Sequence, residues 1–124
     1  MKSMKALLMM FALFMVLTAC NQSDYTIEPE EAKDRLENDE TIVLLDVRTL
    51  EEYNDEHIAG AELLPLSELE SKMASRYPDK TKTYFVYCRT GSRSADAIQI
   101  LSDLGYEDIH NLGGIVDWPY DKAE

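Results

Sequence analysis

Two short runs of apolar residues constrain the fold of this chain more than any other feature of its sequence. Residues 41–47 contain Ile-Val-Leu-Leu, and residues 83–87 contain Tyr-Phe-Val-Tyr. Continuous apolar runs of this length are typical of strands that are buried on both faces. Polar segments with helical spacing follow these runs, so we expect an α/β domain with a mostly parallel sheet and right-handed crossovers.

Weaker patterns complete the predicted sheet and place helices on both of its faces. Further short strands are expected at residues 25–27, 62–64 and 109–112, which makes about five in all. Helices are expected at residues 30–36, 49–57, 66–77 and 94–104. The boundary signals are Pro29 at a helix start, Ser67 as an N-cap and Gly105 as a C-cap.

The composition indicates a single acidic domain. The chain has 124 residues, of which 45% are hydrophobic, enough for one core that needs neither a metal nor a disulfide. Its 24 acidic and 12 basic side chains give a formal charge of −12. Such a surface repels phosphate groups, so nucleic acid is not an expected partner.

The first 20 residues resemble an export signal with a lipidation site. Lys2 and Lys5 precede an apolar stretch that is shorter than the about 20 residues needed to span a bilayer. The following Leu17-Thr18-Ala19-Cys20 resembles a bacterial lipobox, whose cysteine receives a lipid and becomes the mature N-terminus. We therefore expect removal of residues 1–19, a lipidated tether over residues 20–24, and a domain over residues 25–124. Lipid on Cys20 would anchor this domain at the extracytoplasmic face of the cell membrane.

The cysteine content leaves one free thiol. Cys20 and Cys88 are the two cysteines of the chain, and lipidation of Cys20 would exclude a disulfide between them. His57 and His110 form no metal-ligand pattern with either cysteine, so neither a metal nor a cofactor is expected. Cys88 follows a buried strand, and ligands of parallel sheets bind beyond the carboxyl ends of the strands.

The segment after this strand predicts an exposed, reactive thiol. It reads Cys88-Arg89-Thr90-Gly91-Ser92-Arg93-Ser94 and leads into an amphipathic helix. A glycine-containing loop can direct several backbone N–H groups at one point, and the helix adds the positive end of its dipole. Together with Arg89 and Arg93 these groups favour a thiolate, so we expect a lowered pKa for Cys88.

This loop resembles the active-site loop of rhodanese-family sulfurtransferases, and three other regions agree with that family in order and spacing. They are Leu45-Asp46-Val47-Arg48 with Glu51-Glu52-Tyr53, His57-Ile58-Ala59-Gly60-Ala61 with Leu64-Pro65-Leu66, and Gly113-Gly114 with Trp118. The resemblance extends from about Tyr25 to Trp118. Glu56, Ala59 and Asp117 depart from the family pattern, and all three lie outside the loop.

The resemblance implies a rhodanese-like domain that acts as a sulfurtransferase through a persulfide. Cys88 would take a sulfur atom from a small anionic donor such as thiosulfate and pass it to cyanide, an external thiol or a thiol protein. The loop amides would hold the charge of the sulfur, and Arg89 and Arg93 would attract the donor's oxygens. The substrate-binding residues are therefore expected to be Arg89, Thr90, Gly91, Ser92 and Arg93.

Two other functions compete with this interpretation. Cysteine phosphatases also use a strand, an anion-binding loop and a helix, but they place five residues between cysteine and arginine, whereas four separate Cys88 from Arg93. The second alternative is a non-catalytic rhodanese-like module that binds partners or senses sulfur species. The intact cysteine and loop disfavour it.

Structural roles are expected for the other candidate residues. Asp46 and Arg48 would support the loop through an ion pair, for instance between Arg48 and Glu52. His57 is expected to be a hydrogen-bonded structural histidine. Trp118 is expected to close the domain near the loop.

Replacing Cys20 tests the predicted lipid anchor. The Cys20→Ala variant should accumulate as a soluble or unprocessed form, because it lacks the thiol that the lipid modifies. Separation of membrane and soluble fractions, followed by immunoblotting, would measure this. Cys88→Ala, which keeps Cys20, is the control, and equal membrane association of the two variants would contradict the prediction.

Overall fold

The two apolar runs form the central strands of a parallel sheet, as predicted. In the computed structural model, which describes residues 25–124, the strand order is β3-β1-β4-β5 and all neighbours are parallel. The strands are β1 (Val43–Asp46), β3 (Glu62–Leu63), β4 (Thr83–Cys88) and β5 (Asp108–Gly114). Every residue of β1, and all but the first of β4, is buried, which explains why neither sequence alternates between polar and apolar residues.

The structure describes nothing before Tyr25. The predictions for the signal peptide, the tether and lipidation at Cys20 therefore lie outside the described residues. Within residues 25–124, no helix combines the length and the apolar character that crossing a bilayer requires.

The predicted fifth strand is reduced to a single bridge. Thr26 pairs in parallel with Asn111 of β5, and the N–H of Ile27 donates to the Asn111 carbonyl at 3.0 Å. Pro29 then begins a helix, so the segment is too short to continue as a strand. The sequence interpretation also missed a small antiparallel pair, β2 (His57–Ile58) with β6 (Lys122–Ala123), because two-residue strands carry no periodic pattern.

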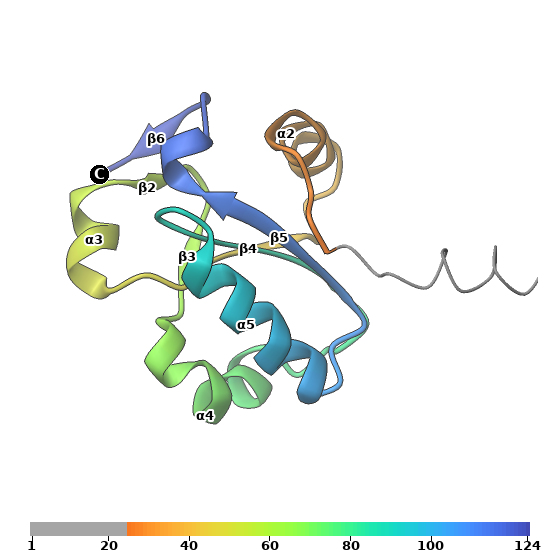
Figure 1. The fold of residues 1–124 in the computed structure, drawn as a ribbon. Coiled ribbons are helices and arrows are strands. Elements are labelled where there is room, and N and C mark those ends of the chain that lie inside the picture. Colours follow the sequence, from red (N-terminus) through yellow and green to blue (C-terminus); the bar gives the residue numbers. More distant parts are fainter. Residues whose placement is uncertain (1–24) are drawn as a thin grey trace, which may run out of the picture.

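Helices cover both faces of the sheet, as predicted (Figure 1). They are α2 (Pro29–Asn38), α3 (Leu50–Asp55), α4 (Leu66–Arg76) and α5 (Ser92–Asp103), with a 3-10 turn η1 (Ile115–Asp117) after β5. The predicted cap at Ser67 is wrong, because α4 follows Pro65 directly and has no side-chain cap. The helix α5 begins two residues earlier than predicted, directly after Gly91, whose φ of 110° ends the preceding loop.

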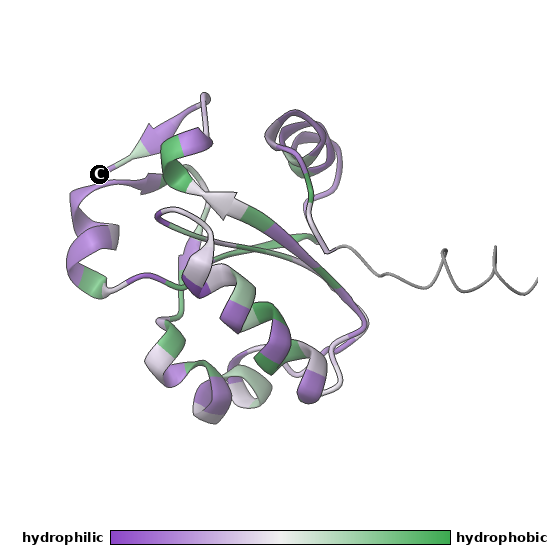
Figure 2. Cartoon of the chain, in the orientation of Figure 1, coloured by the Kyte–Doolittle hydropathy of each residue, from purple (hydrophilic) through white to green (hydrophobic). Residues whose placement is uncertain are grey.

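Alternate residues of β4 enter two separate cores. Tyr84, Val86 and Cys88 pack with α4 and α5, whereas Phe85 and Tyr87 pack with α2 and the segment around Trp118. In Figure 2, hydrophobic residues recur along the strands and α5, whereas α2 is largely hydrophilic. The sulfur of Cys88 therefore belongs to the α4–α5 side of the sheet.

Candidate active site

The chain passes from β4 to α5 through a tight loop of three residues, 89–91. Cys88 is the last residue of β4 and Ser92 is the first of α5. Gly91 has a left-handed conformation that other residues rarely adopt. This conformation lets the chain turn at the end of the loop and enter α5 at the next residue. The thiol is thus placed at the carboxyl end of a central strand and at the N-terminus of a 12-residue helix.

Cys88 is buried, which corrects the expectation of an exposed thiol. The residue is 1% exposed because its side chain packs in the core beneath α5. The N–H of Gly91 donates to its Sγ at 3.0 Å, and the Oγ of Ser94 lies 3.6 Å from the same sulfur. The loop therefore does direct backbone N–H at the sulfur, but the sulfur lies within the protein rather than on its surface.

The surroundings of Cys88 favour its thiolate, as predicted. Burial opposes ionisation, but hydrogen bonds from the side chain and N–H of Ser94, with smaller ones from the N–H groups of Gly91 and Thr90, outweigh it and lower the pKa. The main stabilising groups are thus hydroxyl and amide donors rather than the two arginines. The sequence interpretation expected the two arginines to favour the thiolate as well, in addition to the loop amides and the helix dipole.

Ser94 is a site residue that the sequence interpretation missed. Its fully buried Oγ lies 3.0 Å from the Gly91 carbonyl and 3.3 Å from the Gly113 carbonyl, and the hydroxyl has one proton to donate. When the Cys88 thiol loses its proton, the hydroxyl can turn and donate to the sulfur. A signal for this role existed, because Ser94 shares the buried face of α5 with Ala97, Ile98 and Leu101.

The two arginines of the loop differ in their surroundings. Arg93 donates two hydrogen bonds to Glu52, of 2.7 and 3.0 Å. Its guanidinium is therefore already occupied, whereas the sequence analysis expected it to attract the oxygens of the sulfur donor. The Arg93 hydrogen bonds are the main reason why the pKa of Glu52 falls to about 2. Arg89 is exposed and, with Glu52, lines a hollow of about 290 Å³ beside the loop.

The remaining predicted binding residues, Thr90 and Ser92, present their side chains to solvent. Thr90 contributes to the site through its backbone, since its N–H also favours the Cys88 thiolate. Within residues 25–124, no group of acidic, histidine and cysteine side chains has the arrangement of a metal site.

Asp46 and Arg48 form a buried brace at the end of β1. The Nη2 of Arg48 lies 2.7 Å from Oδ2 of Asp46, and the same nitrogen donates to the Glu56 carbonyl at 2.6 Å. The hydroxyl of Tyr87 donates to Asp46 at 2.7 Å and accepts from the N–H of Ile58 at 3.0 Å. The expectation of an ion pair between Arg48 and Glu52 is therefore wrong, because Arg48 pairs with Asp46 and Glu52 pairs with Arg93.

Trp118 and His57 lie on the α2 side of the sheet. Trp118 is 5% exposed and packs in the core that contains Ile58. The ring of His57 stacks on Tyr53 with centroids 3.8 Å apart, and its Nδ1 lies 2.8 Å from the Tyr53 carbonyl. Both contacts are of the structural kind that the sequence predicted.

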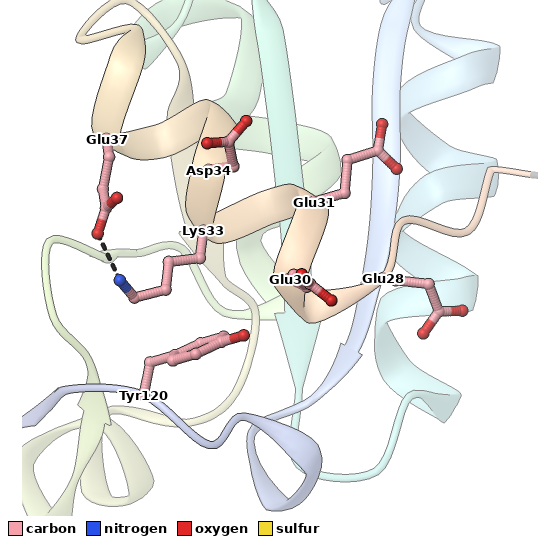
Figure 3. Close-up of a pocket in the computed structure, with 7 residues that line it drawn as sticks. All are labelled: Glu28, Glu30, Glu31, Lys33, Asp34, Glu37 and Tyr120. Atoms are coloured by element: carbon pink, nitrogen blue, oxygen red, sulfur yellow. Dashed lines mark hydrogen bonds and ion pairs between the residues drawn. The ribbon is translucent and has the colours of Figure 1, made fainter.

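A second hollow lies along α2, away from the Cys88 loop (Figure 3). Lys33 forms an ion pair with Glu37 within it and also lies 5.0 Å from the ring centre of Tyr120. Its lining residues are Glu28, Glu30, Glu31, Lys33, Asp34, Glu37 and Tyr120. This acidic surface contains no residue of the loop and would repel an anionic donor.

The fold and the site together define a class of protein, which is a parallel α/β domain with a strand-end thiol whose pKa is lowered by the loop and the helix start that follow it. The chain belongs to the rhodanese family, since the model of the rhodanese-like domain matches residues 28–120. This agrees with the family resemblance of the loop and of the three other regions.

Named relatives support a sulfurtransferase of the rhodanese type. The chain is 44% identical over 80 residues to the thiosulfate sulfurtransferase PspE of Escherichia coli K12, covering 64% of this chain and 77% of PspE. It is 37% identical over 93 residues to a sulfurtransferase of Allochromatium vinosum, covering 74% and 85% of the two chains.

Solved structures agree with this relationship. A rhodanese with anions from E. coli has a TM-score of 0.63 and 40% identity, and the match covers 67% of this chain and 98% of that one. The human single-domain sulfurtransferase TSTD1 has a TM-score of 0.69 and 28% identity, with 77% and 96% covered. The two matches cover nearly the whole of both solved chains, so the similarity extends over the complete domain of each.

The buried brace predicts a large loss of stability on Asp46→Asn. Removing one partner of a buried ion pair leaves the other charge unpaired, so the free energy of unfolding should fall by about 3 kcal/mol. Chemical denaturation would measure the change. Asp96→Asn, which removes the same charge from an exposed position of α5, is the control. Equal stability of the two variants would show that the brace is dispensable.

The role of Ser94 predicts a less reactive thiol in Ser94→Ala. Loss of a hydrogen bond to the thiolate should raise the pKa of Cys88 and slow its alkylation by iodoacetamide at pH 7 about tenfold. The pH dependence of alkylation gives the pKa directly. The exposed Ser92→Ala is the matched control. An unchanged alkylation profile in Ser94→Ala would refute the role of the hydroxyl.

Proposed function

We propose that this chain moves a sulfane sulfur from a small anionic donor such as thiosulfate to an external acceptor, with Cys88 as the carrier. The observation that carries this proposal is the N–H of Gly91, directed at Sγ from 3.0 Å in a loop that lowers the pKa of the thiol. A thiolate is the nucleophilic form of cysteine, and the same donors can hold the negative charge of a persulfide.

The first step is a displacement on the donor. The Cys88 thiolate attacks the outer sulfur of thiosulfate, a bond forms between this sulfur and Sγ, and the bond between the donor's two sulfurs breaks. Sulfite leaves with the electron pair, and Cys88 keeps the outer sulfur as an anionic persulfide. Arg89, an exposed residue of the loop, supplies positive charge for the donor's oxygens.

The second step regenerates the thiolate. A nucleophile such as cyanide or a thiolate attacks the outer sulfur, the bond to Sγ breaks, and its electron pair returns to Cys88. Cys88 is the one free cysteine within residues 25–124, and Cys20 is the expected lipid site. The acceptor is therefore an external molecule, either a small nucleophile or a thiol protein.

We further propose that lipid on Cys20 holds the domain at the extracytoplasmic face of the membrane. Support comes from the sequence alone: two lysines, an apolar stretch and Leu-Thr-Ala-Cys precede the domain in the order of a lipoprotein signal. The acidic surface disfavours direct binding to anionic lipids, so covalent lipid is the means of attachment that fits the chain.

Intact mass spectrometry tests the persulfide directly. The full chain with Cys20→Ala has Cys88 as its single thiol and can be purified in detergent. Incubation with thiosulfate should add the mass of one sulfur atom, and cyanide should then remove it as an equal amount of thiocyanate. The further substitution Cys88→Ser should abolish both changes.

Other outcomes would identify the competing functions. Absence of a sulfur adduct and of thiocyanate in the chain that retains Cys88 would contradict sulfur transfer and favour a non-catalytic module. Hydrolysis of an aryl phosphate that depends on Cys88, without sulfur transfer, would identify a phosphatase.

A further inference from the structure

Three guanidinium groups surround the loop, and two of them are already neutralised. Arg48 is bound to Asp46, with 2.7 Å between Nη2 and Oδ2. Arg93 is bound to Glu52 by two parallel hydrogen bonds, the strong geometry for this pair of groups. None of the ion pairs within residues 25–124 involves Arg89. One unpaired cation is therefore left for a donor.

The hollow beside the loop is not positively charged. Its residues are Arg48, Glu52, Asp55, Glu56, Arg89, Ile115 and Val116. Arg48 is paired with Asp46 and Glu52 with Arg93, so among these residues two carboxylates, Asp55 and Glu56, are left against one guanidinium, Arg89. A donor with two negative charges would meet more repulsion here than a donor with one.

Glu52 is fixed in its position and in its charge. The N–H of Thr49 donates to its carboxylate at 3.2 Å, and the N–H of Glu52 donates to the Thr49 hydroxyl, which together form the capping box of α3. Its hydrogen bonds with Arg93, against the opposing effect of burial, hold its pKa at about 2. The carboxylate therefore holds Arg93 throughout the pH range in which proteins work.

Arg93 is the second residue of α5, directly after the loop that holds Cys88. Its pKa is raised first by the hydrogen bond with Glu52, while burial opposes the rise and the negative charge of Cys88 adds to it. A released Arg93 would therefore act on an anion bound at the loop. Glu52 thus holds a second cation next to the loop.

We propose that Glu52 sets the donor selectivity of this site: by holding Arg93 it leaves Arg89 alone to receive the donor, which favours singly charged organic sulfane donors, such as a thiosulfonate, over doubly charged thiosulfate. This inference rests on the proposed sulfur transfer. With a thiosulfonate, the thiolate takes the outer sulfur in the same displacement, and a sulfinate leaves with the electron pair in place of sulfite. Glu52 acts through Arg93 and is a specificity-determining residue rather than a catalytic one.

The test compares two donors in three forms of the full chain. Initial rates with thiosulfate and with methanethiosulfonate, both at the same cyanide concentration, give kcat and KM for the unchanged chain, Glu52→Gln and Glu51→Gln. Glutamine keeps the side-chain carbonyl that accepts from Thr49, so the capping box survives. Glu51 is the matched control, since it is the exposed neighbour of Glu52 in α3 and carries the same charge.

Glu52→Gln should lower the KM for thiosulfate about tenfold and that for methanethiosulfonate about threefold, with kcat nearly unchanged. Glu51→Gln should leave the ratio of the two KM values unchanged. The double variant Glu52→Gln with Arg93→Gln should not show the lower KM for thiosulfate, because it lacks the guanidinium that Glu52→Gln releases. The inference would be overturned if Glu52→Gln left the ratio of the two KM values unchanged, or if Glu51→Gln changed this ratio equally. It would also be overturned if the KM for thiosulfate stayed low in the double variant without Arg93.

Failure of the proposed function gives a different result. If the unchanged chain forms no persulfide with either donor, sulfur transfer itself is refuted. If the unchanged chain uses both donors but Glu52→Gln does not change their ratio, sulfur transfer stands and the role of Glu52 falls.

Discussion

The active-site loop depends on the close approach of β5 to the residues that follow Cys88. A Cβ at Gly114 would lie 2.3 Å from the carbonyl oxygen of Arg89 and 2.7 Å from the Cα of Thr90, so this position requires glycine. The N–H of Val116 donates to the same Arg89 carbonyl at 3.3 Å. The end of β5 therefore fixes the path of the chain between Cys88 and Gly91, and with it the direction of the N–H that meets the sulfur.

The two ion pairs around the loop serve different purposes because they differ in burial. Asp46 and Arg48 are almost inaccessible to water, and they join the end of β1 to the segment before β2. Arg93 and Glu52 are about one-third exposed, with side-chain exposures of 35% and 27%. Solvent screens the second pair, so it contributes less to stability, yet it neutralises a cation next to the loop that holds Cys88. Stability and electrostatics are thus assigned to separate pairs.

Much of the fold could be predicted from the sequence, because buried parallel strands and amphipathic helices have distinct local patterns. The central pair of strands and the helix after Cys88 were predicted from such patterns. Local patterns could not predict which carboxylate each arginine pairs with. Both Asp46 and Glu52 are near Arg48 in the sequence, and only the folded chain shows that Arg93, which is 41 residues from Glu52, claims that carboxylate. The burial of Cys88 was missed for a related reason, since a residue at a strand end can face either solvent or a helix.

That burial has a consequence for the proposed chemistry. A cysteine that is 1% exposed is poorly accessible to bulky electrophiles, whereas the outer sulfur of a sulfane donor is a single terminal atom. After transfer, the reactive sulfur lies about 2 Å beyond Sγ, the length of a sulfur–sulfur bond. The acceptor attacks this outer atom and never needs to reach Sγ itself. In the proposed reaction, a buried thiol therefore limits the first step to slender donors, while the second step can use a larger nucleophile.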